Sequence, residues 1–217
     1  MRGHGKSTLL RKSLQEHPRV LVIDTLGEHQ KGEDHAGWTK PLEGSIGHNI
    51  DSIIAGRFNR ATVLLPVSEQ EQQESFLYYC RAVYAAARRL NETITLVVEE
   101  IDWYSQPGWE NEGLKLIIQY GRHGPVNLVW TARNIGSVSR KLTSETNHYF
   151  LFHVQEPIWI DAMVKRLGAN VAEAVMNLCN KRPMVDGRLD CPPSSPPFNF
   201  IVANNSGQII REDNVSP

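Results

Sequence analysis

Cysteine is scarce in this chain, and its three cysteines lack the spacing of a metal site. Cys80, Cys179 and Cys191 are far apart and odd in number, so we interpret them as reduced intracellular thiols. No apolar run approaches the length of a membrane span, and Met1 does not open a signal peptide. These absences predict a cytoplasmic protein that is not an integral membrane protein.

The chain also lacks an excess of charge of either sign. Its formal net charge is −1 over 217 residues, and its pI is about 6.7. This balance argues against a surface coated with positive charge for nucleic acid, but it is compatible with a few basic loops. Hydrophobic residues make up 41% of the chain, which is ordinary for a soluble globular protein, and the length suits one α/β domain.

The N-terminus carries most of a phosphate-binding loop. The segment Met1-Arg2-Gly3-His4-Gly5-Lys6-Ser7-Thr8 holds the second half of the pattern G-x-x-x-x-G-K-[ST], whose first glycine would precede Met1. Gly3, His4, Gly5, Lys6, Ser7 and Thr8 are therefore predicted to bind a nucleotide at the start of a helix. Lys6 would neutralise the β- and γ-phosphates, and the Ser7 hydroxyl would bind Mg²⁺. The predicted ligands are ATP and Mg²⁺.

Apolar runs that alternate with helical patterns organise the rest of the chain. We predict strands over 19–24, 61–67, 93–100, 126–132 and 148–154, and helices over 8–14, 69–90, 109–120, 157–167 and 169–180. The segment 28–49 is predicted to be a long irregular excursion, and 191–197 a proline-rich connection before a closing hairpin of 198–203 with 208–210. This order predicts one α/β domain over 1–217, with 190–217 as the connection and hairpin, around a mostly parallel sheet that contains the five earlier strands.

Two acids end the predicted strand 93–100. Hydrolysis of a triphosphate with Mg²⁺ needs one carboxylate near the metal and another that activates water. We assign the metal role to Glu99 and the catalytic-base role to Glu100. Aspartate is the usual first acid in this arrangement, and a pair of exposed acids at a strand end is the competing interpretation.

Further motifs resemble the FtsK-HerA superfamily of DNA-translocating and DNA-packaging ATPases. Asp24, Gly27 and Glu28 match a stretch Asp-x-x-Gly-Glu that follows the second strand in HerA-like members, with His29 where an aromatic residue is common. The other likenesses are the Glu99-Glu100 pair, the segment Tyr120-Gly121-Arg122-His123-Gly124, and the strand that ends in Thr131-Ala132-Arg133. The resemblance covers about residues 1 to 170.

The resemblance implies a three-layer P-loop NTPase fold of the RecA and FtsK-HerA type, here without the strand that precedes the loop. It also implies a homo-oligomeric ring, expected to be a hexamer, in which an arginine of the neighbouring subunit completes each active site. Arg122 is the first candidate for that arginine, with Arg133 and Arg140 as alternatives. Arg133 also replaces the glutamine that senses the γ-phosphate in the family.

The implied function is an ATP-hydrolysing motor that moves double-stranded DNA. The short chain resembles the packaging ATPases of membrane-containing tailless viruses, which implies a virus or prophage genome as cargo, capsid or membrane proteins of the virion as partners, and the host cytoplasm or virion as location. Arg140-Lys141 and the 103–109 loop are candidate DNA contacts, although Trp103, Tyr104 and Trp109 are better explained by subunit packing.

Two other functions remain open at this point. One is a small-molecule phosphotransferase of the nucleotide-kinase type, against which the chain shows no arginine-rich lid. The other is a nucleotide-binding protein with impaired catalysis, which the missing strand would explain. The incomplete loop also leads us to expect that the natural start lies upstream of Met1.

Overall fold

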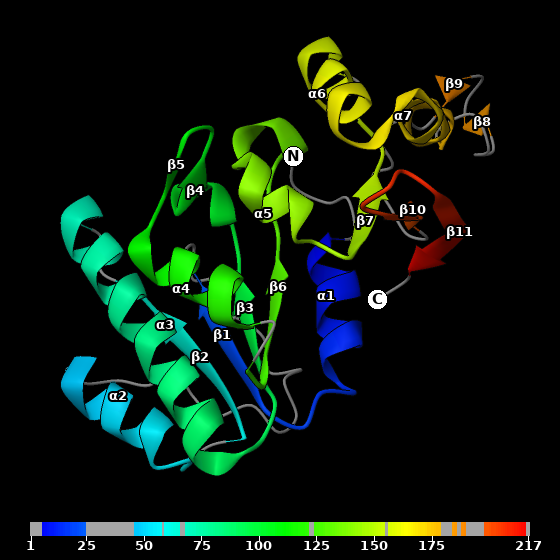
Figure 1. Cartoon of the computed structure of the whole chain (residues 1–217). Coiled ribbons are helices and arrows are strands. Elements are labelled where there is room, and N and C mark those ends of the chain that lie inside the picture. Colours follow the sequence, from blue (N-terminus) through cyan, green and yellow to red (C-terminus); the bar gives the residue numbers. More distant parts are fainter. Residues whose placement is uncertain are drawn as a thin grey trace. The chain divides into compact units, whose positions relative to one another are not determined.

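The computed structural model describes residues 6–24, 46–57, 59–65, 68–121, 124–154, 156–178, 184–185, 188–189 and 198–215. Its contacts cluster into two compact units. One unit is Leu14–Ala132, and the other combines Met1–Ser13 with Arg133–Pro217. Each unit contains a sheet of its own (Figure 1).

The unit Leu14–Ala132 is built on a four-stranded parallel sheet in the order β2-β1-β3-β6. The strands are β1 (Val20–Asp24), β2 (Arg60–Leu64), β3 (Ile94–Val98) and β6 (Val126–Trp130). Every residue of β1 and β3 is buried, as expected for strands inside a parallel sheet. This sheet confirms the predicted α/β class with a mostly parallel central sheet.

Three helices lie on the same side of this sheet (Figure 1). Helix α3 (Glu69–Leu90) contacts β3 and β6, while α2 (Ile46–Ile54) and α4 (Glu112–Tyr120) pack against α3. Apolar residues at helical spacing on α3 are buried, among them Phe76, Cys80, Val83 and Ala87. Burial also raises the pKa of the Cys80 thiol, which keeps it protonated and unreactive.

Helix α2 corrects the prediction that the irregular excursion extends to residue 49. Glycine, histidine and asparagine in this stretch are poor helix formers, so the local sequence argued against a helix. Tertiary packing stabilises the helix despite this composition. Ile53 is buried, and Asn49 Nδ2 donates a buried hydrogen bond of 3.1 Å to the Tyr79 hydroxyl on α3.

A hairpin corrects the start of the helix predicted over 109–120. Strands β4 (Ser105–Gln106) and β5 (Trp109–Glu110) pair antiparallel, and Gly108 between them has a φ of 85°. Helix α4 begins only at Glu112, where the Asn111 side chain accepts a hydrogen bond of 2.8 Å from Gly113 N. Pro107-Gly108 is a turn signal, but the helical pattern of the residues that follow led to the prediction of a helix from residue 109.

The other unit holds a three-stranded antiparallel sheet in the order β11-β10-β7. Its strands are β7 (His148–Phe152), β10 (Phe198–Asn204) and β11 (Ile209–Val215), so the predicted closing hairpin is present as β10 and β11. We expected β7 in the parallel sheet, and this was wrong among the described residues. Strand β7 instead pairs with the apolar strand β10, whose residues 200–203 are buried.

Helices of this second unit are α1 (Lys6–Leu14), α5 (Arg140–Ser144), α6 (Pro157–Leu167) and α7 (Ala169–Asn177). Two short strands, β8 (Met184–Val185) and β9 (Arg188–Leu189), form a further hairpin. Leu9 of α1 packs against a buried cluster of Phe200 and Val202, so the helix that follows the predicted loop is anchored on the antiparallel sheet. Within the described ranges, no helix combines the length and apolar character needed to cross a membrane.

The close approach of α3 and α4 gives a stability test at Gly113. A Cβ atom there would lie 2.8 Å from Leu77 Cα and 2.9 Å from Cys80 Cβ, so Gly113→Ala must push the two helices apart. We expect it to lower the free energy of unfolding by about 1–3 kcal/mol, measured by denaturant unfolding.

Gly121, at the other end of α4, is the matched control. A Cβ there would find its nearest atom at 3.4 Å, and its backbone is already helical. Gly121→Ala should therefore change stability by less than about 1 kcal/mol. Equal losses in the two variants would contradict the close-packing explanation.

Candidate nucleotide-binding site

The structure describes the predicted phosphate-binding loop only from Lys6 onward. Lys6 is the first residue of α1, followed by Ser7 and Thr8 in its first turn, and all three side chains are half-buried. The first turn contains no acidic residue, so nothing on it opposes an anion at the positive end of the helix. The predicted loop residues Gly3, His4 and Gly5 lie outside the described residues.

The acid side of the predicted site lies at the carboxyl ends of β1 and β3. Ile23 pairs with Val98, and Glu99 N donates a hydrogen bond of 3.2 Å to Ile23 O. This register places Asp24 and Glu99 next to each other where neighbouring parallel strands end, which is where open α/β sheets bind ligands. Asp24 is fully buried and Glu99 is 5% exposed.

Glu100 has an unusual backbone conformation. Its φ of 52° and ψ of 51° lie in the left-handed region, which costs a non-glycine residue roughly 1–2 kcal/mol. Its side chain is half-buried, unlike that of Glu99. A strained residue persists only where its surroundings fix it, and such residues cluster at functional sites. Glu99 and Glu100 are adjacent in sequence, but they differ in burial and in backbone conformation.

Thr131 is the residue that fixes Glu100. Its Oγ1 accepts a hydrogen bond of 3.1 Å from Glu100 N, and its carbonyl oxygen accepts one of 2.8 Å from Ile101 N. Thr131 N in turn donates to Val98 O at 3.0 Å. The ends of β3 and β6 are thus joined by three hydrogen bonds on both sides of the bend at Glu100.

The chain that follows Glu100 is also anchored. It forms a short 3₁₀ helix, η1 (Ile101–Trp103), and then reaches Tyr104, whose ring stacks on Phe76 of α3 with centroids 3.8 Å apart. Tyr104 is fully buried within its unit, so the expectation that it packs between subunits was wrong. Trp103 and Trp109 are 39% and 45% exposed, and their packing between subunits stays a prediction.

Sequence reasoning gave neither Asp24 nor Thr131 a place in the site. From the sequence, Asp24 is part of a family motif and Thr131 lies at the end of a predicted strand. An acid directly after an apolar strand was an available signal for Asp24. The hydrogen bonds of Thr131 depend on the register between β3 and β6, which the sequence alone does not specify.

The predicted arginines are only partly described. Arg122 lies outside the described residues, as do Gly27, Glu28 and His29. Arg133 is exposed just beyond β6 and belongs to the unit that contains Arg133–Pro217.

The donor atoms at the strand ends suit Mg²⁺. No group of three or more His, Cys, Asp or Glu side chains within the described ranges could hold a metal ion. However, Mg²⁺ is usually held by one or two carboxylates with water and substrate phosphates, and Asp24 and Glu99 are two such carboxylates. Their oxygen chemistry therefore fits the predicted ion.

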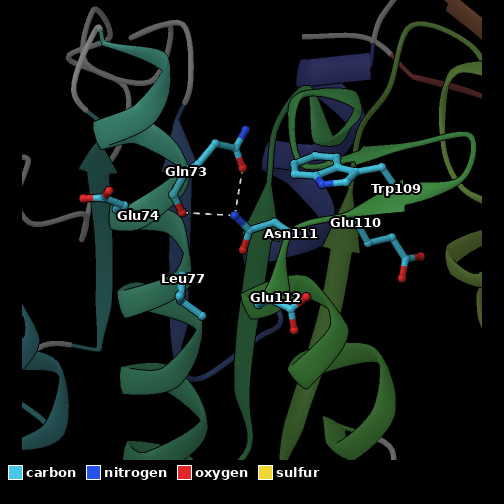
Figure 2. Close-up of a pocket in the computed structure, with 7 residues that line it drawn as sticks. All are labelled: Gln73, Glu74, Leu77, Trp109, Glu110, Asn111 and Glu112. Atoms are coloured by element: carbon cyan, nitrogen blue, oxygen red, sulfur yellow. Dashed lines mark hydrogen bonds between the residues drawn. The ribbon is translucent and has the colours of Figure 1, made fainter.

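A separate hollow of about 220 Å³ lies beside the β4–β5 hairpin (Figure 2). It is lined by Gln73, Glu74, Leu77, Trp109, Glu110, Asn111 and Glu112. Two of the lining residues are hydrogen-bonded to each other: Asn111 Nδ2 donates to Gln73 O on α3 at 3.0 Å and to Gln73 Oε1 at 2.8 Å. None of the predicted nucleotide-binding or catalytic residues lines it, so this hollow is not the predicted site.

The strained backbone of Glu100 gives a direct test. Glycine adopts the left-handed conformation without steric cost, whereas alanine does not. Glu100→Gly should therefore be more stable to unfolding than Glu100→Ala by about 1 kcal/mol, measured in denaturant, although both variants lose the carboxylate. If the two variants are equally stable, Glu100 does not hold this conformation in solution.

Comparisons with known proteins identify the fold. No protein-family model and no curated protein sequence matches the chain. Among solved structures, the genome packaging NTPase B204 of Sulfolobus turreted icosahedral virus 2 matches in complex with ATP-gammaS, with a TM-score of 0.69 and 14% identity over 100% of this chain and 93% of B204. The sulfate complex of the same NTPase matches with a TM-score of 0.71 and 14% identity, over 100% and 92% of the two chains.

B204 of Sulfolobus Turreted Icosahedral Virus, described as a DNA-packaging ATPase, also matches. Its TM-score is 0.69 at 13% identity, over 99% of this chain and 92% of that one. At such low identity, the likeness concerns the course of the chain and not the chemistry of individual residues. The four-stranded parallel sheet with its helices confirms the predicted fold class: this chain has a P-loop NTPase fold.

Proposed function

We propose that this protein is an ATP-hydrolysing motor that translocates double-stranded DNA during the packaging of a virus or prophage genome. The observation that carries the proposal is Glu100, an acid held in a left-handed conformation at the end of the central strand β3 by Thr131. The likeness of the fold to a genome packaging NTPase that has been solved with ATP-gammaS and AMPPCP supports the same assignment.

The loop residues bind the nucleotide in this proposal. Backbone N–H groups from Gly3 to Ser7, which include those of His4 and Gly5, surround the β-phosphate, and the Lys6 ammonium group neutralises the β- and γ-phosphates. The Ser7 hydroxyl and the Glu99 carboxylate hold Mg²⁺, which when bound supplies positive charge to the phosphate oxygens. Asp24, buried beside Glu99, is a further carboxylate for the water molecules around the ion.

Glu100 acts as the catalytic base. Its carboxylate takes a proton from a water molecule whose oxygen attacks the γ-phosphorus, while the bond from phosphorus to the β–γ bridging oxygen breaks and ADP leaves. Arg122 from a neighbouring subunit stabilises the negative charge of the transition state, and Arg133 is an alternative residue for that role. The half-buried position of Glu100 suits a base that must meet water.

The proposed assembly follows from the same resemblance. The subunits form a homo-oligomeric ring, expected to be a hexamer, around double-stranded DNA, and capsid or membrane proteins of the virion are the other partners. The proposed location is the host cytoplasm or the virion.

Two variants test hydrolysis. Glu100→Gln keeps the size of the side chain but cannot accept the proton, and Lys6→Ala removes the phosphate-binding charge. Each should lower DNA-stimulated ATP hydrolysis by about 100-fold or more, measured as phosphate release. Lys12→Ala, which removes an exposed lysine from the same helix, should retain the activity and is the matched control.

The outcomes separate the candidate functions. DNA-stimulated hydrolysis that persists in both the Lys6 and Glu100 variants would refute the assigned roles. Transfer of phosphate to a small-molecule acceptor, without any effect of DNA, would indicate a phosphotransferase. ATP binding without hydrolysis in the natural protein would indicate a nucleotide-binding protein with impaired catalysis.

A further inference from the structure

A group of basic residues lies where α5 and α6 meet in the second unit. Arg166, in the last turn of α6, donates from Nη2 to Val138 O at 2.8 Å and from Nη1 to Ser139 O at 3.2 Å. Its Nη1 also donates to Thr143 Oγ1 at 2.8 Å. These bonds fix the guanidinium group of Arg166 against the start of α5, where Arg140 is the first helical residue.

Within the described part of the chain, the hydrogen bonds of Arg166 leave its positive charge without a negative partner, because all three acceptors are neutral oxygens. Burial lowers the pKa of Arg166, and the nearby positive charge of Arg140 lowers it further, so the two guanidinium groups repel each other. Tyr149 does not supply the missing negative charge, since burial raises the pKa of its phenol to about 12. At neutral pH the phenol therefore stays uncharged.

As far as the structure describes the chain, the exposed members of the group also lack acidic partners. Arg140 and Lys141 both lie in the first turn of α5 with exposed side chains. Among the described residues, no ion pair joins Arg140, Lys141 or Arg166 to a carboxylate. The guanidinium groups of Arg140 and Arg166 are thus held near each other at a cost in repulsion, and Lys141 follows Arg140 on the same exposed turn.

We propose that Arg140, Lys141 and Arg166 form a contact surface for the phosphate backbone of double-stranded DNA. A phosphate would relieve the repulsion, and a planar guanidinium group can bind two phosphate oxygens at once. The chain as a whole carries a net charge of only −1 and gives DNA no general attraction, so a local cluster must supply it. This inference rests on the proposed function and names where the moved DNA is held.

Phosphate contacts of this kind carry no sequence information. DNA duplexes of different sequence should therefore bind with similar affinity. This expectation suits a protein that must move along a whole genome.

The test compares two double variants that lose the same charge. Arg140→Ala with Lys141→Ala removes two members of the proposed surface. Arg88→Ala with Arg89→Ala removes two exposed arginines from the last turn of α3, in the other unit. Binding of a fluorescent duplex of random sequence is measured by anisotropy without nucleotide, between about 50 and 200 mM salt. Circular dichroism confirms that both variants are folded.

The proposed surface predicts a specific change in the salt dependence. The slope of log K against log salt should become shallower by about two for the Arg140 and Lys141 variant, because two phosphate contacts are lost, and by less than about half a unit for the Arg88 and Arg89 variant. Equal changes in the two variants would show that only net charge matters and would overturn the inference. So would an unchanged slope combined with a loss of basal ATP hydrolysis, which would place Arg140 at the nucleotide instead.

The remaining outcomes separate this inference from the proposed function. If the natural protein hydrolyses ATP but does not bind duplex DNA, the surface is refuted while hydrolysis stands. If it binds duplex DNA with the predicted slopes but does not hydrolyse ATP, the surface stands and the motor is refuted. Tighter binding to single-stranded RNA than to duplex DNA would refute the assigned ligand.

Discussion

The three hydrogen bonds of Thr131 are the constraint on which the candidate site depends. They join the ends of β3 and β6 and hold Glu100 in a conformation that it would otherwise leave at a gain of roughly 1–2 kcal/mol. Every residue of β3 is buried, whichever face its side chain points to, so an acid that continued this strand regularly is expected to be buried as well. The bend instead gives the two consecutive acids different environments. Different environments are what a metal ligand and a base require of two otherwise identical side chains.

Most of the fold followed from apolar periodicity, and the failures have local physical causes. Runs such as Val20–Asp24 and Ile94–Val98 are apolar enough that strand and parallel sheet were predictable together. Helix α2 was missed because its glycine, histidine and asparagine lower helix propensity, and only burial against α3 outweighs them. At residues 109–111 the error was the reverse. A helical pattern was extended through Trp109 and Glu110, although Pro107-Gly108 marks a turn.

The candidate site was predictable in composition but not in geometry. Glu99 and Glu100 were recognisable because two acids follow an apolar strand, and Lys6 and Ser7 because they stand in a phosphate-loop pattern. Both residues are glutamate, so the sequence could not show that Glu99 is buried and that Glu100 is only half-buried. It depends on Thr131, which is 31 positions further along the chain than Glu100. Hydrogen bonds over such separations follow from sheet register, which single-sequence patterns do not determine.

In the proposed motor, the distribution of charge requires that ATP and DNA are bound by different groups of residues. Asp24, Glu99 and Glu100 place three acidic side chains at the end of the parallel sheet, and acidic groups there oppose the approach of the phosphates of both ATP and DNA. In the proposed function, ATP is accommodated because Lys6 and a bound Mg²⁺ would supply compensating positive charge. A long DNA backbone has no such compensation at this edge, so it must be held by cations elsewhere. The proposed contact surface of Arg140, Lys141 and Arg166, for which no ion pair is present among the described residues, is our candidate for that role. The near-zero net charge of the chain therefore does not exclude local groups of charge of either sign.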